Sequence, residues 1–113
     1  MSQITTHILD TTRGKPAQGV TIALYHQTGS DWREIALGTT NADGRIADLL
    51  PKDKTLPAGI YKMYFETQAY FDGLGVTTFY PFVEIVFQIT GTGEHYHVPL
   101  LLNPFGYSTY RGS

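Results

Sequence analysis

The chain has 113 residues, of which 42% are hydrophobic and 16% charged, and its formal net charge is −2. This composition is typical of a globular protein, and we expect one domain over residues 1–113 with a core that needs no covalent cross-links. The basic residues are scattered, which argues against nucleic acid or an anionic membrane as a partner. Cysteine is absent, which excludes disulfides, thiolate metal ligands and a cysteine nucleophile.

The first ten residues, MSQITTHILD, lack the basic stretch and the following apolar run of a secretory signal. No segment approaches the roughly eighteen consecutive apolar residues that a membrane-spanning helix needs. These two features predict a cytoplasmic protein. A leader removed from a longer precursor stays an open alternative.

Short runs that favour β-strands alternate with turn signals along the chain. Val20–His26 and Gly59–Thr67 show the alternation of a half-buried strand, and Tyr61, Met63 and Phe65 share one face of the second run. Turn signals recur at the spacing found in sandwiches. The pattern therefore predicts an all-β sandwich of about eight strands.

The remaining expected strands follow the same reasoning, and they are Ile4–Asp10, Trp32–Thr39, Phe82–Ile89, His95–Leu102 and Phe105–Arg111. A further short strand is expected to begin at Arg45, because Asn41–Gly44 resembles a hairpin turn. Gln68–Leu74 is expected to form one short helix that ends at glycine. The stretch Thr11–Gln18 is predicted to be a polar loop.

Three of the four histidines fall on the less apolar faces of predicted strands. His95 and His97 are two residues apart and therefore project from one face, whereas Tyr96 and Val98 point to the opposite face and the core. His7 lies on the corresponding face of the first strand. A single histidine in such a position is more often solvated than functional.

A His-x-His pair with a third histidine from elsewhere also matches the geometry of a zinc site. Arg45 and Arg111 would be unfavourable neighbours for a cation, and we expect no metal. His26 ends a strand before a polar loop and is expected at the surface. The sequence holds neither a Gly-x-Ser-x-Gly elbow nor a phosphate-binding glycine loop. Any chemistry therefore depends on histidine as acid or base, supported by arginine and tyrosine.

A resemblance to a known family lies in four segments: THILDTTRGKPAQGV (residues 6–20), TTNADGRI (39–46), FYPFVEIVF (79–87) and HYHVPLLLNPFGYSTYRGS (95–113). With the strand pattern between them, they cover essentially the whole chain. The chain resembles the transthyretin-related proteins that act as 5-hydroxyisourate hydrolases. The Tyr-Arg-Gly-Ser ending separates these hydrolases from the hormone carrier transthyretin. Asn103 replaces an expected serine in a turn, which puts no chemistry in doubt.

The resemblance implies a transthyretin-like two-sheet, eight-stranded sandwich that assembles as a homotetramer, a dimer of dimers. The first strand and the last two would share the sheet that faces the channel between dimers. Carried over position by position, the family's active site falls on five residues: His7, Arg45 and His97 as catalytic groups, with Tyr110 and Ser113 joining His7 and Arg45 in substrate binding. His95 belongs to the same tail motif, and we rank it second.

The implied reaction is the hydrolytic opening of the six-membered ring of 5-hydroxyisourate to 2-oxo-4-hydroxy-4-carboxy-5-ureidoimidazoline, without metal or organic cofactor. The attacking water needs a base to accept its proton, and the leaving nitrogen needs an acid to donate one. The oxyanion that forms on the carbonyl needs a cation to stabilise it. We expect His97 to be the base, His7 the acid or water-positioning group, and Arg45 the oxyanion stabiliser and substrate clamp. The two histidine roles could be exchanged.

The main alternative is a transthyretin-like carrier that binds a small aromatic ligand in the same channel. A carrier would line that channel with apolar and neutral residues, whereas this sequence places histidines there. A purely structural sandwich would leave the tail motif unexplained. The sequence therefore favours the hydrolase.

Overall fold

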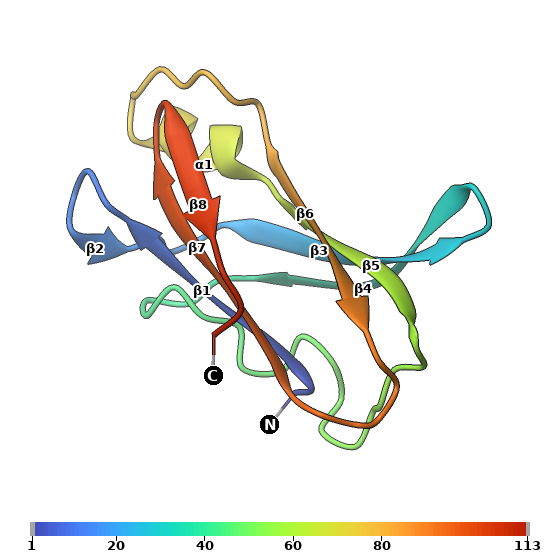
Figure 1. Cartoon of the computed structure of the whole chain (residues 1–113). Helices are drawn as coiled ribbons and strands as arrows, with labels where there is room; N and C mark the ends of the chain where they lie inside the picture. Colours follow the sequence, from blue (N-terminus) through green and yellow to red (C-terminus); the bar gives the residue numbers. More distant parts are fainter. Residues whose placement is uncertain (1, 113) are drawn as a thin grey trace.

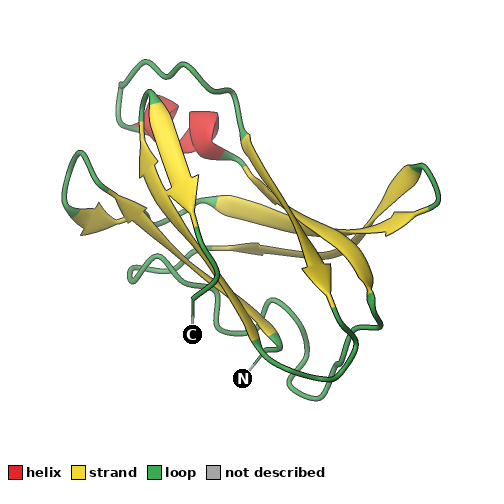
Figure 2. Ribbon diagram, in the orientation of Figure 1, coloured by secondary structure: helices red, strands yellow, loops and turns green. Residues whose placement is uncertain are grey.

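Two four-stranded sheets packed face to face make up the computed structural model, which describes residues 2–112 (Figures 1 and 2). The first sheet, sheet A, has the strand order β2–β1–β7–β8 and contains β1 (Ile4–Asp10), β2 (Lys15–Pro16), β7 (Tyr96–Asn103) and β8 (Gly106–Thr109). The second, sheet B, has the order β4–β3–β5–β6 and contains β3 (Thr21–Thr28), β4 (Asp31–Thr39), β5 (Gly59–Phe65) and β6 (Val83–Ile89). The helix α1 (Thr67–Gly73) follows β5.

The prediction of an eight-stranded sandwich with one short helix is confirmed over residues 2–112. The observed helix begins and ends one residue before the predicted segment. Its seven residues are too few to cross a bilayer, and the described part of the chain contains no helix that could do so.

Two local predictions were wrong. Lys15 and Pro16 lie in the stretch expected to be a loop, yet they form β2 because a turn at Gly14, with φ of 64°, folds the chain back onto Leu9 and Asp10. Arg45 makes a single bridge to His7 instead of beginning a strand. The next residue, Ile46, is buried, so the chain leaves the sheet edge at once to enter the core.

The core lies between the two sheets and follows from strand alternation. Tyr61, Met63 and Phe65 are fully buried on the inner face of β5, as predicted, and Ile22 and Leu24 are fully buried on β3. Sheet A contributes inward residues at alternate positions of β1 and β7, namely Ile4, Ile8, Val98, Leu100 and Leu102. Burying each such side chain stabilises the fold by about 1.5–3 kcal/mol.

The same alternation leaves a second, less buried face on sheet A. Thr5, His7 and Leu9 alternate with buried neighbours along β1, and His97 does so on β7. Strands β1 and β7 run parallel, with Thr5 opposite His97 and His7 opposite Pro99. Residues from the beginning and the end of the chain therefore share this outer face of sheet A.

Candidate active site

The two predicted catalytic histidines reach the outer face of sheet A from neighbouring strands. His7 comes from β1 and His97 from β7, and both side chains are half-buried. The predicted face of each strand is confirmed, because Tyr96 and Val98 are buried on the opposite side. Strand pairing thus brings together two histidines that are 90 residues apart in sequence.

The turn before Arg45 delivers the arginine to this face. The Oδ1 atom of Asn41 accepts hydrogen bonds from the backbone N–H groups of Asp43 (2.9 Å) and Arg45 (3.1 Å). The Gly44 carbonyl accepts from the Ile8 N–H at 2.9 Å, and Arg45 then bridges to His7. A Cβ at position 44 would lie 2.5 Å from the Ile8 carbonyl oxygen, and φ there is +72°. Glycine is therefore required at this position.

A surface cavity of about 520 Å³ opens beside Arg45 and His97, and His7 is not among the residues that line it. The residues that line it are Thr5, Thr6, Asn41, Arg45, Ile46, Ala47, His95 and His97. Its wall combines a guanidinium, two imidazoles and a hydroxyl with the apolar groups of Ile46 and Ala47. Such a site can hold a small polar ring and present both charge and proton acceptors to it.

Burial and positive charge lower the pKa of both predicted catalytic histidines. For His97, loss of water contact is the largest cause, followed by the charge of Arg45 and by His95 and His7. For His7, burial is again first and Arg45 second, while the Asp43 carbonyl and carboxylate oppose the lowering. Both imidazoles therefore favour the neutral form near neutral pH, in which each has one nitrogen able to accept a proton.

Thr5 joins the two histidines of the His-x-His pair, and our sequence reasoning missed it. Its Oγ1 atom lies 2.8 Å from Nδ1 of His97 and 3.0 Å from Nε2 of His95. Strand register could have indicated this residue, since Thr5 and His7 share one face of β1. The parallel pairing that places Thr5 opposite His97 was not evident from the sequence.

The tail residues pack directly on His97. The Gly112 N–H donates to the His97 carbonyl at 2.8 Å, and a Cβ on Gly112 would lie 2.5 Å from Cδ2 of the His97 ring. Arg111 stacks over the Tyr96 ring at 4.6 Å and pairs with Glu94 at 3.5 Å. The glycine of the tail motif is thus explained by the close approach of an imidazole.

Tyr110 lines a different cavity from the one lined by His95 and His97. It is 58% exposed and lines a separate cavity of about 330 Å³ with residues of β6 and β7, including Phe87 and Val98. Its role at the substrate stays a prediction, as does that of Ser113, which lies outside the described residues.

The zinc alternative finds little support in the geometry. Within residues 2–112, no three histidine, cysteine or acidic side chains gather as a group of metal ligands. One ring nitrogen each of His95 and His97 is already engaged by Thr5.

The fold and the site together define a class: two-sheet sandwiches with an ionisable histidine–arginine site on the outer face of one sheet. The model of the HIUase/Transthyretin family matches residues 4–112, and the chain belongs to this family. It is 50% identical to the probable 5-hydroxyisourate hydrolase of Schizosaccharomyces pombe, with 97% of this chain and 90% of that protein covered.

Solved structures of a hydrolase and of a transthyretin both resemble this chain. The 5-hydroxyisourate hydrolase of Klebsiella pneumoniae superposes with a TM-score of 0.85 at 42% identity, covering 97% of this chain and 98% of that one. Sea bream transthyretin, solved in complex with thyroxine, gives a TM-score of 0.91 at 37% identity, covering 97% and 94%. Because the backbone matches both proteins well, function must be argued from the side chains of the site.

Proposed function

We propose that this chain is a 5-hydroxyisourate hydrolase that opens the ring of its substrate at the His7–Arg45–His97 site. The observation that carries the proposal is the cavity in which a half-buried imidazole of lowered pKa lies beside a guanidinium. A carrier of apolar ligands gains nothing from such groups, since their desolvation costs binding energy. A hydrolase needs them, and the relatives at 42–50% identity are named for this activity.

The neutral His97 ring is the general base. It accepts a proton from the attacking water while the water oxygen forms a bond to the ring carbonyl carbon. Arg45 stabilises the negative charge that develops on the carbonyl oxygen and can hold two acceptor atoms of the planar substrate at once. His7 donates its ring N–H proton to the nitrogen as the carbon–nitrogen bond breaks, and it takes a proton back from solvent. The new carboxylic acid ionises, so one proton leaves for solvent in each turnover.

The direct test uses freshly generated 5-hydroxyisourate, which decays slowly by itself. Micromolar protein should accelerate the loss of its ultraviolet absorbance and yield a single enantiomer of the product. Dialysis against a strong chelator should leave the rate unchanged, because the proposed chemistry needs no metal. The absence of any acceleration over the uncatalysed decay would refute the hydrolase, and ligand binding without turnover would favour a carrier.

We also infer that the active protein is a homotetramer whose sites lie between dimers. Strands β6 and β8 are edges of their sheets, and exposed apolar side chains surround them, including Phe79 (70% exposed), Val86 (56%) and Phe105 (67%). Free strand edges with apolar surroundings favour pairing with a second copy. A second dimer on the outer face of sheet A would exclude water from the histidines and strengthen their electrostatics.

Light scattering at the assay concentration tests the assembly. We expect the mass of four chains. The substitutions Val86→Lys and Leu101→Lys should each reduce assembly and activity together. A folded and fully active monomer or dimer would refute the shared site, although the hydrolase proposal would survive that result.

A further inference from the structure

The Thr5 hydroxyl lies between two imidazole nitrogens and has a single hydrogen to share between them. It lies 2.8 Å from Nδ1 of His97 and 3.0 Å from Nε2 of His95. A hydroxyl donates one hydrogen bond and accepts others, and a neutral imidazole has one N–H and one acceptor nitrogen. If Thr5 donates to one ring, the other ring must donate to Thr5. The tautomers of the two histidines are therefore coupled.

Two neutral arrangements use the Thr5 hydroxyl as a donor to one of the rings, and in a third Thr5 accepts from both rings, which also leaves Nε2 of His97 unprotonated. In the first, Nδ1–H of His97 donates to Thr5 and the hydroxyl donates to Nε2 of His95, which leaves Nε2 of His97 free to accept a proton. In the second, both bonds are reversed, and Nε2 of His97 carries the hydrogen. The first arrangement makes His97 a base, and the second makes it a hydrogen-bond donor toward the cavity.

We propose that Thr5 and His95 are positioning residues that hold His97 in its base tautomer and pass its proton to solvent. This inference rests on the proposed function, because it assigns a task within the same hydrolysis. The contact with Thr5 is made by Nδ1 of His97, so the first arrangement, with hydrogen on Nδ1, is the one that leaves Nε2 able to act as a base.

The proton balance of the relay closes without any further reactant. When Nε2 of His97 takes a proton from water, the ring becomes an imidazolium. Its Nδ1–H then moves to the Thr5 oxygen as the hydroxyl hydrogen moves to Nε2 of His95. His97 is left neutral with hydrogen on Nε2, and His95 carries the charge and releases a proton from Nδ1 to water. The base tautomer is restored when His95 takes a proton from water on Nδ1, both hydrogen bonds reverse, and His97 releases its Nε2 hydrogen to solvent.

Exposure gives the relay a direction. His97 is half-buried in the cavity wall, whereas His95 is exposed. The charged and titratable groups around the pair are Arg45 and His7 at His97, with Arg111, Glu94, Lys52 and Lys54 near His95. The Arg111 guanidinium donates to the His95 carbonyl, and Glu94 is bonded to Tyr96 and Arg111 and not to the His95 ring. Within residues 2–112 no carboxylate bonds to that ring, so none of the described acidic groups retains the proton on His95.

Replacing Thr5 separates the relay from a structural role. Thr5→Val keeps the shape and removes the hydroxyl, whereas Thr5→Ser restores it. We expect Thr5→Val to lower kcat about tenfold or more with KM nearly unchanged, because less of His97 would be in its base tautomer. Thr5→Ser should recover most of the rate. Thr11→Val, which loses a hydroxyl bonded to the Leu102 carbonyl at 3.2 Å, is the matched control and should keep wild-type kcat.

Nitrogen-15 NMR of labelled histidines reads the tautomer without any turnover. Wild-type His97 should show a protonated Nδ1 and an unprotonated Nε2 above neutral pH, and Thr5→Val should show a mixture of the two tautomers. His95→Gln retains a hydrogen-bonding group but cannot carry the proton. Its kcat should fall several-fold and recover on addition of free imidazole.

The possible outcomes distinguish this inference from the proposed function. Thr5→Val with wild-type kcat and an unchanged His97 tautomer would overturn the relay while leaving the hydrolase intact. If the wild-type protein fails to turn over 5-hydroxyisourate, the proposed function fails, and the NMR measurement still decides whether Thr5 sets the tautomer. Thermal unfolding of each variant checks that a lost rate does not come from lost structure.

Discussion

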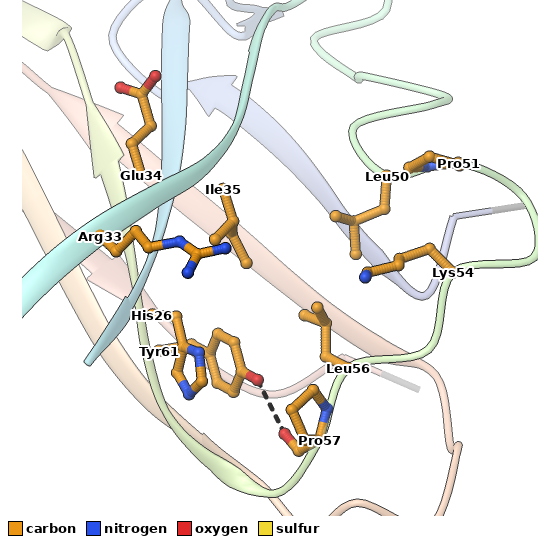
Figure 3. A pocket seen from close by; sticks show the side chains of 10 residues that line it. All are labelled: His26, Arg33, Glu34, Ile35, Leu50, Pro51, Lys54, Leu56, Pro57 and Tyr61. Atoms are coloured by element: carbon orange, nitrogen blue, oxygen red, sulfur yellow. Dashed lines mark hydrogen bonds between the residues drawn. The ribbon is translucent and has the colours of Figure 1, made fainter. Parts of the chain in front are cut away.

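Two regions of the sandwich combine a histidine, an arginine and a cavity, and they differ in how the histidine is held. The first is the His7–Arg45–His97 site on sheet A. The second is a cavity at the His26 end of sheet B, lined by residues of β3, β4, β5 and the loop before β5 (Figure 3). The second is slightly larger, at about 570 Å³ against about 520 Å³. Cavity size therefore does not identify the site of chemistry.

The His26 ring is fixed by stacking and not by a polar network. It lies flat on the Tyr61 ring, with centroids 4.4 Å apart and planes 7° from parallel. Figure 3 shows the Arg33 guanidinium and the Lys54 ammonium directed into the cavity from opposite sides, above apolar residues such as Leu56. Stacking of this kind stabilises the fold, whereas acid–base chemistry needs a ring nitrogen directed at the substrate.

The comparison teaches that the same residue types have different uses in the two regions. At the sheet A site, a hydroxyl engages one nitrogen of His97 and a nearby guanidinium acts on the ring. The His26 region has an aromatic ring that stacks on the histidine and two cationic side chains, yet within residues 2–112 no comparable hydrogen-bonded pair of histidines lies there. The following paired variants test this difference.

The largest effect is expected from the histidines themselves. His97→Asn should lower kcat by about 10²–10⁴-fold, since it removes the general base. His26→Asn should leave kcat within about twofold and lower stability by about 1 kcal/mol, the size of one aromatic pair. Steady-state hydrolysis and thermal unfolding of both variants provide the measurement. A comparable rate loss in both would show that the two regions are not functionally distinct.

Arginine replacement should give the next largest effect. Arg45→Lys keeps the charge but loses the planar fork, and we expect a loss of about a hundredfold in kcat/KM, similar to loss of one oxyanion donor. Arg33→Lys, in the other cavity, is the matched control and should retain wild-type kinetics. Near-normal turnover of Arg45→Lys would show either that Arg45 contributes only its charge or that it makes no contact with the reacting substrate.

Two glycines test whether the tail positions His97. Gly112→Ala would bring a Cβ to 2.5 Å from the His97 ring, and the ring must then move. A shift of about 1 Å at a catalytic group can reduce the rate up to about a hundredfold. We expect a loss of about tenfold. Gly73→Ala meets no atom within 4 Å and lies at the end of α1, so it should leave the rate unchanged. Equal rates for both variants would contradict a positioning role for the tail.

Sequence patterns predicted the strands well because alternation is a local property. The buried face of Tyr61, Met63 and Phe65 followed directly from the order of apolar and polar residues. The two wrong elements depend on tertiary contacts: Lys15–Pro16 forms a strand only because β1 offers an edge, and Arg45 leaves the sheet because Ile46 enters the core.

The candidate site was predictable in part. His7, Arg45 and His97 were assigned through the family resemblance, and the structure brings them to one face of sheet A. Thr5 and Gly112 were missed because their roles depend on which strand pairs with which and on a close approach of 2.5 Å. Tyr110 is predicted to act at the substrate, yet within one chain it lines another cavity. Its predicted role at the substrate therefore depends on the proposed assembly.

The smallest and most specific effect concerns pH. The pKa values of His7 and His97 are lowered below their ordinary 6.5, first by burial and second by the charge of Arg45. As pH falls below about 6.5, the unfolded chain therefore binds more protons than the folded chain. The free energy of unfolding should have its full value above that pH and should decrease as pH falls toward the pKa values of the folded state. The acid limb of kcat/KM should likewise lie below 6.5, because the base stays unprotonated there.

A pair of variants assigns this limb to one of the two regions. Arg45→Gln removes the neighbouring charge, so the acid limb of its residual activity should move upward toward 6.5, while burial keeps it from moving further. His26→Asn should leave the limb where the wild type has it, because that ring lies on Tyr61 and away from the substrate. The profile of kcat/KM between pH 4.5 and 8 is the measurement. If the acid limb stays fixed in Arg45→Gln, the guanidinium does not lower the pKa of the base. If the limb moves in His26→Asn, the titrating group lies in the His26 cavity and not at the sheet A site.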